Sequence, residues 1–316
     1  MTSINTNRPE QEIILAGASF ALGSSCFGQV LAPSYLRNHG IVNLLNSQAI
    51  KVRDLGDIAT SYNPAELRIR SQKAHYLAEV SEYQTELFKF LKSNISLGDF
   101  LLLIGGDHSV SAAGFAARQA VYNQNNNEQK LGLLWVDTHA DINTLETTIS
   151  GRLHGMILSS LAGLGPLDIE TVFGKTKVLD LDNLVYLGLR DLDLGEVDLI
   201  KNSSIKAIYT QDIKSRGLES CLAEALAYLS SKTEHYIASF DFDVCDPSWL
   251  SAVANPVPDG INISEASELL TKLGADPKCI GLDLVEFDPT NDPNSESLKA
   301  ILKLVACFAE GMTQRF

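Results

Sequence analysis

The chain has 316 residues, of which 45% are hydrophobic and 20% are charged. This length fits one large α/β domain or two modest domains, and the composition excludes a disordered chain and a small disulfide-bonded scaffold. With 25 basic and 39 acidic residues the net charge is −14 when the histidines are neutral, which disfavours nucleic acid and anionic membranes as partners.

Cysteine usage and the first residues indicate the compartment. The five cysteines stand singly, without a CxxC pair, and their odd number indicates free thiols in a reducing environment. Residues 1–12 lack the basic stretch and the apolar run of a signal peptide, and we expect them to form a flexible N-terminal extension. No apolar segment approaches the ~20 residues of a membrane span. A cytoplasmic protein is therefore expected.

Along the chain, short apolar runs alternate with stretches whose apolar residues are spaced three and four apart. The short runs are typical of strands buried on both faces of a parallel sheet, and they lie at 13–16, 100–104, 131–136, 184–189, 205–209, 235–240 and 279–284. Helices are predicted at 65–92, 218–230 and 297–310. The polar stretch 123–130 is a loop too short to separate domains. The alternation predicts an α/β fold with a helix-covered, mostly parallel sheet in a single domain spanning 1–316.

Four predicted strand ends concentrate acidic residues and histidines, at the edge where open parallel sheets bind their ligands. Isolated carboxylates there cost several kcal/mol each to desolvate unless a cation or a donor compensates them. The segments 101–109, 133–143, 238–247 and 281–289 contain no Lys or Arg, which favours divalent metal ions over protein cations in that role. Their acidic residues and histidines are Asp107, His108, Asp137, His139, Asp141, Asp241, Asp243, Asp246, Asp283, Glu286 and Asp288.

The spacing within two of these segments indicates a metal centre. In an extended chain Asp137, His139 and Asp141 share one face, and Asp241 and Asp243 repeat the arrangement. A mixed set of imidazole and carboxylate ligands suits Mn²⁺ better than the sulfur-rich structural sites of zinc. Such a set exceeds what one catalytic ion needs, so we expect a pair of ions that share carboxylates. Any one of these residues alone is equally well explained as a helix cap, a turn or a structural histidine.

The motifs GGDHS, WVDTHADIN, SGRLHGM and SFDFDVCDP together resemble the signature regions of the ureohydrolases, the family of arginase, agmatinase and formimidoylglutamase. The similarity continues in YLGLRDLDLGE and GLDLVEFDP and covers roughly positions 13 to 290. It implies a three-layer α/β/α fold with a mostly parallel eight-stranded sheet, two Mn²⁺ ions per subunit, and hydrolysis of a guanidino or formimino group. The implied metal ligands are His108, Asp137, His139, Asp141, Asp241 and Asp243.

Within the family the pattern resembles arginase. Asn143, Thr148 and Ser150 match positions that bind an α-carboxylate, and Asp193 and Glu196 match positions that face an α-amino group. Hydroxyl and amide donors suit an anion, and carboxylates suit an ammonium group. Without the resemblance, the hydroxyl and carboxylate members of this set are better explained as turns, helix caps or solvated charges. The expected substrate is L-arginine, cleaved to L-ornithine and urea.

Two positions depart from the arginase pattern. Arg152 stands where Asn is usual, and Ala254-Asn255 replaces Gly-Thr in the loop after the second aspartate pair. Arg152 either adds a fork of charged donors for a substrate carboxylate or points to solvent. Asn255 lies where a Thr helps to position the guanidino end. Formimidoylglutamase, agmatinase and hydrolysis of another guanidino acid therefore stay open as alternatives.

The resemblance also implies catalytic roles. The metal pair would activate water for attack on the guanidino carbon. Glu286 would pair with the guanidinium, and Asp141 would pass a proton to the leaving amine. His154, in SGRLHGM, resembles the proton-shuttling histidine of the family, and its alternative is a loop histidine without a catalytic role.

Other classes of function are less well supported by the sequence. A non-catalytic, metal-binding regulatory homologue tends to lose ligands, and a dinuclear phosphoesterase needs a basic phosphate clamp. Because family members are generally trimers or hexamers, we expect a homo-oligomer, although Ser264-Glu265 stands where some arginases have an Arg-Glu pair at the trimer contact. Structural roles are expected for Cys245, His39, His75 and His235.

Overall fold

The computed structural model describes residues 12–48, 50–59, 62, 67–123 and 130–315. Its centre is an eight-stranded sheet with the order β2-β1-β3-β8-β7-β4-β5-β6, and every neighbouring pair of strands is parallel. The expected eight-stranded sheet is therefore confirmed. The strands are β1 (Ile13–Ser19), β2 (Val52–Ala59), β3 (Phe100–Gly105), β4 (Gly132–Val136), β5 (Leu184–Leu189), β6 (Lys206–Tyr209), β7 (Tyr236–Asp241) and β8 (Cys279–Val285).

The N-terminal extension expected at 1–12 lies outside the described residues except for Glu12. The carbonyl of Glu12 accepts a hydrogen bond from Phe100 N at 3.2 Å, and its carboxylate is 3.3 Å from Arg53 Nε. Glu12 is thus tied to the start of β3 and to the edge strand β2.

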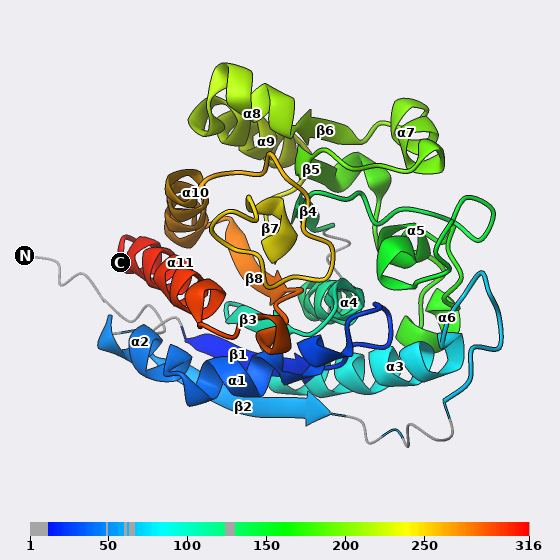
Figure 1. Ribbon diagram of the computed structural model, residues 1–316, viewed down its shortest axis with the longest axis horizontal. Coiled ribbons are helices and arrows are strands. Elements are labelled where there is room, and N and C mark those ends of the chain that lie inside the picture. Colours follow the sequence, from blue (N-terminus) through cyan, green and yellow to red (C-terminus); the bar gives the residue numbers. More distant parts are fainter. Residues whose placement is uncertain (1–11, 49, 60–61, 63–66, 124–129, 316) are drawn as a thin grey trace, which may run out of the picture.

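Helices cover both faces of the sheet (Figure 1). Alternate residues of β1 face opposite cores, since Ile13 and Leu15 pack in one hydrophobic cluster and Ile14 and Ala16 in the other. The three-layer α/β/α prediction is confirmed. The first layer holds α1 (Ala32–Asn38), α2 (Ile41–Ser47), α8 (Thr210–Arg216), α9 (Leu218–Lys232), α10 (Ile263–Ala275) and α11 (Glu296–Thr313). The second holds α3 (Leu77–Asn94), α4 (Ser111–Tyr122), α5 (Ile157–Leu161), α6 (Ile169–Phe173) and α7 (Leu194–Lys201).

Two differences from the sequence prediction have local causes. Strand β2 was not predicted, because this edge strand is partly exposed and carries Asp54 and Asp57 in place of a continuous apolar run. The helix predicted at 65–92 begins only at Leu77, because Tyr76 has φ 53°, a left-handed conformation that interrupts helical hydrogen bonding. Residues 65 and 66 of that prediction lie outside the described part of the chain.

Short 3-10 helices lie in the connections between strands, and those that follow β3, β7 and β8 bring side chains to the carboxyl edge of the sheet. They are η1 (Phe27–Leu31), η2 (His108–Val110), η3 (His154–Met156), η4 (Leu181–Asn183), η5 (Phe242–Val244) and η6 (Pro289–Asn291). The five cysteines are all free, as expected. Among the described residues, no helix has the length and apolarity needed to cross a membrane.

Candidate metal centre and active site

The predicted site residues follow five adjacent strands of the sheet, β3, β8, β7, β4 and β5. Strands β3 and β4 are consecutive along the chain, but β8 and β7 lie between them in the sheet. Because all strands are parallel, their carboxyl ends meet at one edge, and the ligand-binding crevice of such sheets lies where the strand order is interrupted. Topology therefore gathers these segments in one place.

His108, the first residue of η2, is fully buried and faces three carboxylates. Its Nδ1 is 3.1 Å from Asp137 Oδ2 and 3.1 Å from Asp241 Oδ2. Asp141 Oδ2 lies 3.3 Å from the same nitrogen. The opposite ring nitrogen, Nε2, is 2.8 Å from Ser239 Oγ, whereas Nδ1 has no hydrogen-bond partner among the described residues. A buried imidazole nitrogen that is left without a hydrogen bond beside carboxylates fits a metal ligand.

Asp137 joins two groups of ligand-type side chains. Its Oδ2 faces His108, and its Oδ1 is 3.6 Å from His139 Nδ1, which in turn lies 2.9 Å from Asp243 Oδ2. In each group the ligand atoms lie within 4.8 Å of one another, and Asp137 belongs to both. The two groups are His108, Asp137 and Asp241, and Asp137, His139 and Asp243.

Backbone hydrogen bonds fix these carboxylates. The N–H of His139 donates to Asp137 Oδ1 at 2.7 Å, and the N–H of Asp243 donates to Asp241 Oδ1 at 2.7 Å. Asp141 has φ 50°, and its carbonyl accepts from Leu158 N at 3.0 Å. A left-handed conformation at a non-glycine residue is strained and is typical of functional sites. The loops therefore hold these carboxylates in place through their backbone.

Crowding of the carboxylates shifts their pKa values. Burial, followed by the charge of Asp137, raises the pKa of Asp141, and burial and the charge of Asp243 raise that of Asp241. Burial raises the pKa of Asp243 to about 6, despite the opposing effect of His139. Burial also acts to raise the pKa of Asp137, but its two histidine neighbours outweigh this and lower it. A divalent cation would relieve this repulsion, so the donor set fits bound metal.

Glu286 lies beside the metal centre at the end of β8, with φ 72°. Its Oε1 accepts from His108 N at 2.7 Å and is 3.1 Å from His154 Nδ1, and its Oε2 accepts from Gln29 Nε2. Burial by itself lowers the pKa of His154, but Glu286, together with the charges of Asp141 and Asp107, raises it to about 9. Burial acts to raise the pKa of Glu286, and His154 in turn lowers it. The two side chains therefore form an ion pair at neutral pH.

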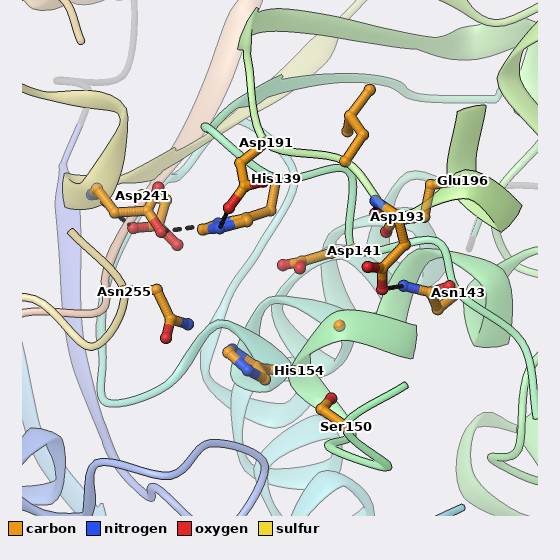
Figure 2. A pocket seen from close by; sticks show the side chains of 13 residues that line it. His139, Asp141, Asn143, Ser150, His154, Asp191, Asp193, Glu196, Asp241 and Asn255 are labelled. Atoms are coloured by element: carbon orange, nitrogen blue, oxygen red, sulfur yellow. Dashed lines mark hydrogen bonds and ion pairs between the residues drawn. The ribbon is translucent and has the colours of Figure 1, made fainter. Parts of the chain in front are cut away.

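A pocket with a cavity volume of about 140 Å³ opens beside the metal centre. Figure 2 shows His139 and Asp241 at one side of this pocket, Asn143 and Asp193 at the other, and His154 and Asn255 facing it. Asn143 Nδ2 donates to Asp193 Oδ2 at 2.9 Å. The predicted site residues that line the pocket are His139, Asp141, Asn143, Ser150, His154, Asp193, Glu196, Asp241, Asp243 and Asn255.

Asp193 and Glu196 combine a pocket position with a structural role. They form the capping box of α7, in which Glu196 Oε2 accepts from Asp193 N at 3.0 Å. Glu196 Oε1 accepts from Ile142 N at 3.2 Å, and burial, followed by the charge of Asp141, raises the pKa of Glu196 to about 7. Both residues thus belong to the start of α7: the cap fixes the Glu196 carboxylate at the pocket wall, and Asn143 holds that of Asp193.

Two predicted substrate contacts are engaged elsewhere. Thr148 is buried, and its Oγ1 accepts from Gly151 N at 3.0 Å, which is the turn interpretation of this residue. Arg152 Nη1 donates to Ser24 O at 2.8 Å and so ties its loop to the segment after β1. Neither belongs to the pocket wall formed by the described residues.

Sequence reasoning missed several residues of the site. Asp191 lines the pocket, and its Oδ2 is 3.7 Å from His139 Nε2. Trp135 Nε1 donates to Asp137 Oδ2 at 2.8 Å. The spacing could have revealed both residues. Trp135 stands two residues before Asp137, and Asp191 stands two residues before Asp193. In an extended chain, residues two apart share a face.

Besides Asp141 and Glu286, four acidic residues of the strand-end segments lie outside the two ligand groups. The preference for metal ions over protein cations at these ends is wrong for Asp283, whose Oδ1 is 2.9 Å from Arg118 Nη1. Arg118 comes from α4, a segment distant in sequence, so the local absence of basic residues did not reveal it. Asp107 instead accepts from Gly23 N at 2.7 Å. The four are Asp107, Asp246, Asp283 and Asp288.

The sheet and the histidine–aspartate groups at its edge define an α/β protein with side chains that could hold metal ions. A model of the Arginase family matches residues 11–310. An arginase of Neurospora crassa is 31% identical over 312 residues, which cover 94% of this chain and 85% of that protein. The chain therefore belongs to the Arginase family and is a hydrolase that acts on a guanidino group.

Solved structures agree with this assignment. An arginase of Entamoeba histolytica, crystallised in complex with L-ornithine, superposes with a TM-score of 0.86 at 25% identity and covers 94% of this chain and 98% of its own. A formimidoylglutamase of Bacillus subtilis superposes with a TM-score of 0.72 at 19% identity, covering 96% of this chain and 87% of its own. The second likeness shows a shared fold alone.

Proposed function

We propose that this protein hydrolyses L-arginine to L-ornithine and urea with two bound Mn²⁺ ions. The observation that carries the proposal is Asp137, whose two oxygens face one histidine each and so join the two ligand groups into one centre. The amide, hydroxyl and carboxylate groups of the adjoining pocket suit a free amino acid. Membership of the Arginase family and the arginase relatives support the same substrate.

Metal, when bound, supplies the activation of water for hydrolysis of a planar carbon centre. We assign His108, Asp137, Asp141 and Asp241 to one ion and Asp137, His139 and Asp243 to the other. Carboxylate oxygens outnumber imidazole nitrogens in this set and thiolates take no part, which favours manganese over zinc.

Glu286, His154 and Asp141 are assigned to the reacting end of the substrate. The Glu286 carboxylate orients the guanidinium by charge-assisted hydrogen bonds. His154, with its pKa raised to about 9 by Glu286 against the opposing effect of burial, holds a proton at neutral pH and can deliver it to the leaving amine. Asp141 faces both the metal centre and the pocket, so it is placed to hand on a proton from the attacking water.

The far end of the pocket is assigned to the α-amino and α-carboxylate groups. Asp193 and Glu196 lie on the pocket wall as acceptors for the ammonium group, fixed by the start of α7. Asn143 and Ser150 supply donors for the carboxylate. Asn255 lines the pocket and is assigned to the guanidino end.

A substrate comparison tests the proposal. The manganese-loaded protein is incubated separately with L-arginine, agmatine and N-formimidoyl-L-glutamate; urea is measured for the first two and formamide for the third. We expect urea from arginine, loss of activity after chelation, and recovery on adding Mn²⁺. Formamide release alone would establish the formimidoylglutamase alternative, and urea from agmatine alone would establish agmatinase. Full activity without metal would contradict the two-ion scheme.

Two variants separate the metal and proton-transfer roles. Asp137→Ala should abolish activity together with manganese content, because both ligand groups lose a member. His154→Asn should lower kcat by about 10²-fold, the usual contribution of a general acid, and leave manganese content unchanged. Wild-type turnover in His154→Asn would reject its assignment. Undetectable hydrolysis of all three substrates by a protein that binds two ions would favour a non-catalytic, regulatory homologue.

The compartment, domain organisation and assembly are extensions of this proposal. The free thiols support a reducing compartment, for which we propose the cytoplasm. We propose that residues 1–316 form one domain that assembles as a homo-oligomer, a trimer or hexamer. Glu265, considered above for the trimer contact, accepts from Asn262 N at 2.8 Å in the capping box of α10. Light scattering of the purified protein tests the assembly.

A further inference from the structure

Arg190 follows β5, and all hydrogen bonds of its guanidinium to the described residues go to backbone carbonyls. Nη2 donates to Asp243 O at 2.8 Å and to Val257 O at 2.9 Å, and Nε donates to Pro258 O at 3.1 Å. Nη1 donates to Val244 O at 3.2 Å. One side chain thereby joins the segment of a proposed metal ligand, Asp243, to the loop that follows Asn255.

The backbone of Arg190 holds a third segment. Its N–H donates to Thr138 O at 3.0 Å, and the N–H of Asp191 donates to the same carbonyl at 3.2 Å. Thr138 stands between the proposed ligands Asp137 and His139, and its Oγ1 donates to Asp243 O at 2.7 Å. Thr138 and Arg190 thus both donate to the carbonyl of Asp243. These hydrogen bonds fix the segment that carries Asp137 and His139 relative to the segment that carries Asp243.

The end of β5 approaches these segments closely enough to require glycine at position 188. Gly188 has φ 110°, and a Cβ there would lie 2.5 Å from Val244 Cγ2 and 3.3 Å from Asp137 O. This contact and the conformation together place Arg190 between the two ligand-bearing segments. The first group differs, because His108 comes from η2 and Asp241 ends β7, and Arg190 contacts neither of them by hydrogen bonding.

We propose that Arg190 is a positioning residue that builds the second of the two metal sites, formed by Asp137, His139 and Asp243, and leaves the first site largely independent of it. This role rests on the proposed two-ion function. Arg190 acts through the backbone of Asp243 and Thr138 rather than by touching the metal or the substrate.

The charge of Arg190 and its positioning role predict opposite effects on metal affinity when the side chain is replaced, so the role can be tested. A guanidinium near a metal site repels the cation, so its removal would tighten metal binding if charge were its only influence. If Arg190 positions the ligands, its removal weakens binding. Arg190→Met removes both the charge and the donors, whereas Arg190→Lys keeps the charge but loses the planar fork that reaches several carbonyls at once.

Arg315 offers a matched control. Its guanidinium also donates to backbone carbonyls, those of Leu273 and Cys279 at 2.9 Å each and that of Gly274, but these lie at the end of α10 and the start of β8. Arg315→Met therefore removes a comparable set of hydrogen bonds at a place remote from the carboxyl edge of the sheet. It measures what a general loss of stability does to metal binding.

The experiment is a Mn²⁺ titration of metal-free wild type, Arg190→Met, Arg190→Lys and Arg315→Met by calorimetry, with electron paramagnetic resonance to distinguish a lone ion from an interacting pair. We expect wild type and Arg315→Met to bind two ions. Both Arg190 variants should bind one ion normally and the second about 10–100-fold more weakly, the range found when a residue supporting a metal ligand is lost. If Arg190→Met does not fold, Arg190→Lys carries the test.

The outcomes separate this role from the proposed function. Two ions bound as tightly as in wild type, or more tightly, by both Arg190 variants would overturn the positioning role and leave the two-ion centre intact. Equal weakening in Arg315→Met would also overturn it, since the effect would then follow from stability alone. A wild-type protein that binds no manganese would overturn the proposed function, and the role of Arg190 with it.

Discussion

Ser239 stands two residues before Asp241 in β7, and its hydroxyl lies 2.8 Å from Nε2 of His108. A small polar residue inside an apolar strand carries no sequence signal for this role, because the partner is distant in the chain. The hydrogen bond leaves Nδ1 of His108 turned toward the carboxylates. At the scale of single residues, the candidate ligands could therefore be selected from motifs, whereas the groups that orient them could not.

Replacing Ser239 should weaken metal binding without removing a ligand. In Ser239→Ala the His108 ring loses the partner that fixes its orientation, and we expect the affinity for the ion nearest His108 to fall about 10–100-fold. Calorimetric titration with Mn²⁺ measures this. Ser267→Ala, in α10, is the control and should bind as wild type does. Unchanged affinity in Ser239→Ala would show that packing alone orients the ring.

The ion pair of His154 and Glu286 should make stability depend on pH. Burial lowers the pKa of His154, but Glu286, together with the charges of Asp141 and Asp107, raises the pKa to about 9 in the folded protein, against ~6.5 for an unfolded chain. The pair therefore stabilises the metal-free fold fully below pH ~6.5 and loses this contribution as the pH rises through about 9.

Urea unfolding of wild type and His154→Asn in the presence of chelator measures this contribution. The difference in free energy of unfolding should be roughly 2–3 kcal/mol near pH 6 and should shrink toward pH 10. A difference that grows with pH would mean that the histidine is neutral in the folded protein and that the pairing is wrong.

At the scale of elements, the apolar runs predicted the buried strands and the helices with clear periodicity. They missed β2, whose Arg53, Asp54 and Asp57 are typical of an exposed edge and not of a buried strand. Placement of the site at the carboxyl edge could be predicted because every strand is parallel. The Asp283–Arg118 pair could not, because it joins β8 to α4 beneath that edge.

Breaking this buried pair should destabilise the fold. The Arg118 and Asp283 side chains are only 3% and 1% exposed, so Asp283→Leu leaves an unpaired buried charge and should cost about 3–5 kcal/mol. Removing both charges in Arg118→Met/Asp283→Leu should recover part of that loss. Urea denaturation of the single and double variants tests this prediction, and additive losses in the double variant would show that the pair contributes nothing as a pair.

At the scale of the whole molecule, the carboxyl ends of neighbouring strands bring buried carboxylates together, and these carboxylates repel one another. Three of them, Asp141, Asp241 and Asp243, have raised pKa values in which burial is the largest cause, and that of Asp243 is about 6. Groups with raised acidic pKa values destabilise the metal-free fold increasingly as the pH rises and they ionise. The fold is therefore expected to depend on metal most strongly at neutral and alkaline pH.

Manganese should accordingly stabilise the protein in a pH-dependent way. At a free concentration 100 times its dissociation constant, one ion adds about 2.7 kcal/mol to the free energy of unfolding. As the pH falls through about 6, protons compete for Asp243 and its neighbours, so the added stability should decline. Thermal unfolding with and without Mn²⁺ at pH 8 and pH 5 measures the increment, and Asp137→Ala should show little at either pH. An increment larger at pH 5 than at pH 8 would mean that manganese binds elsewhere than among these carboxylates.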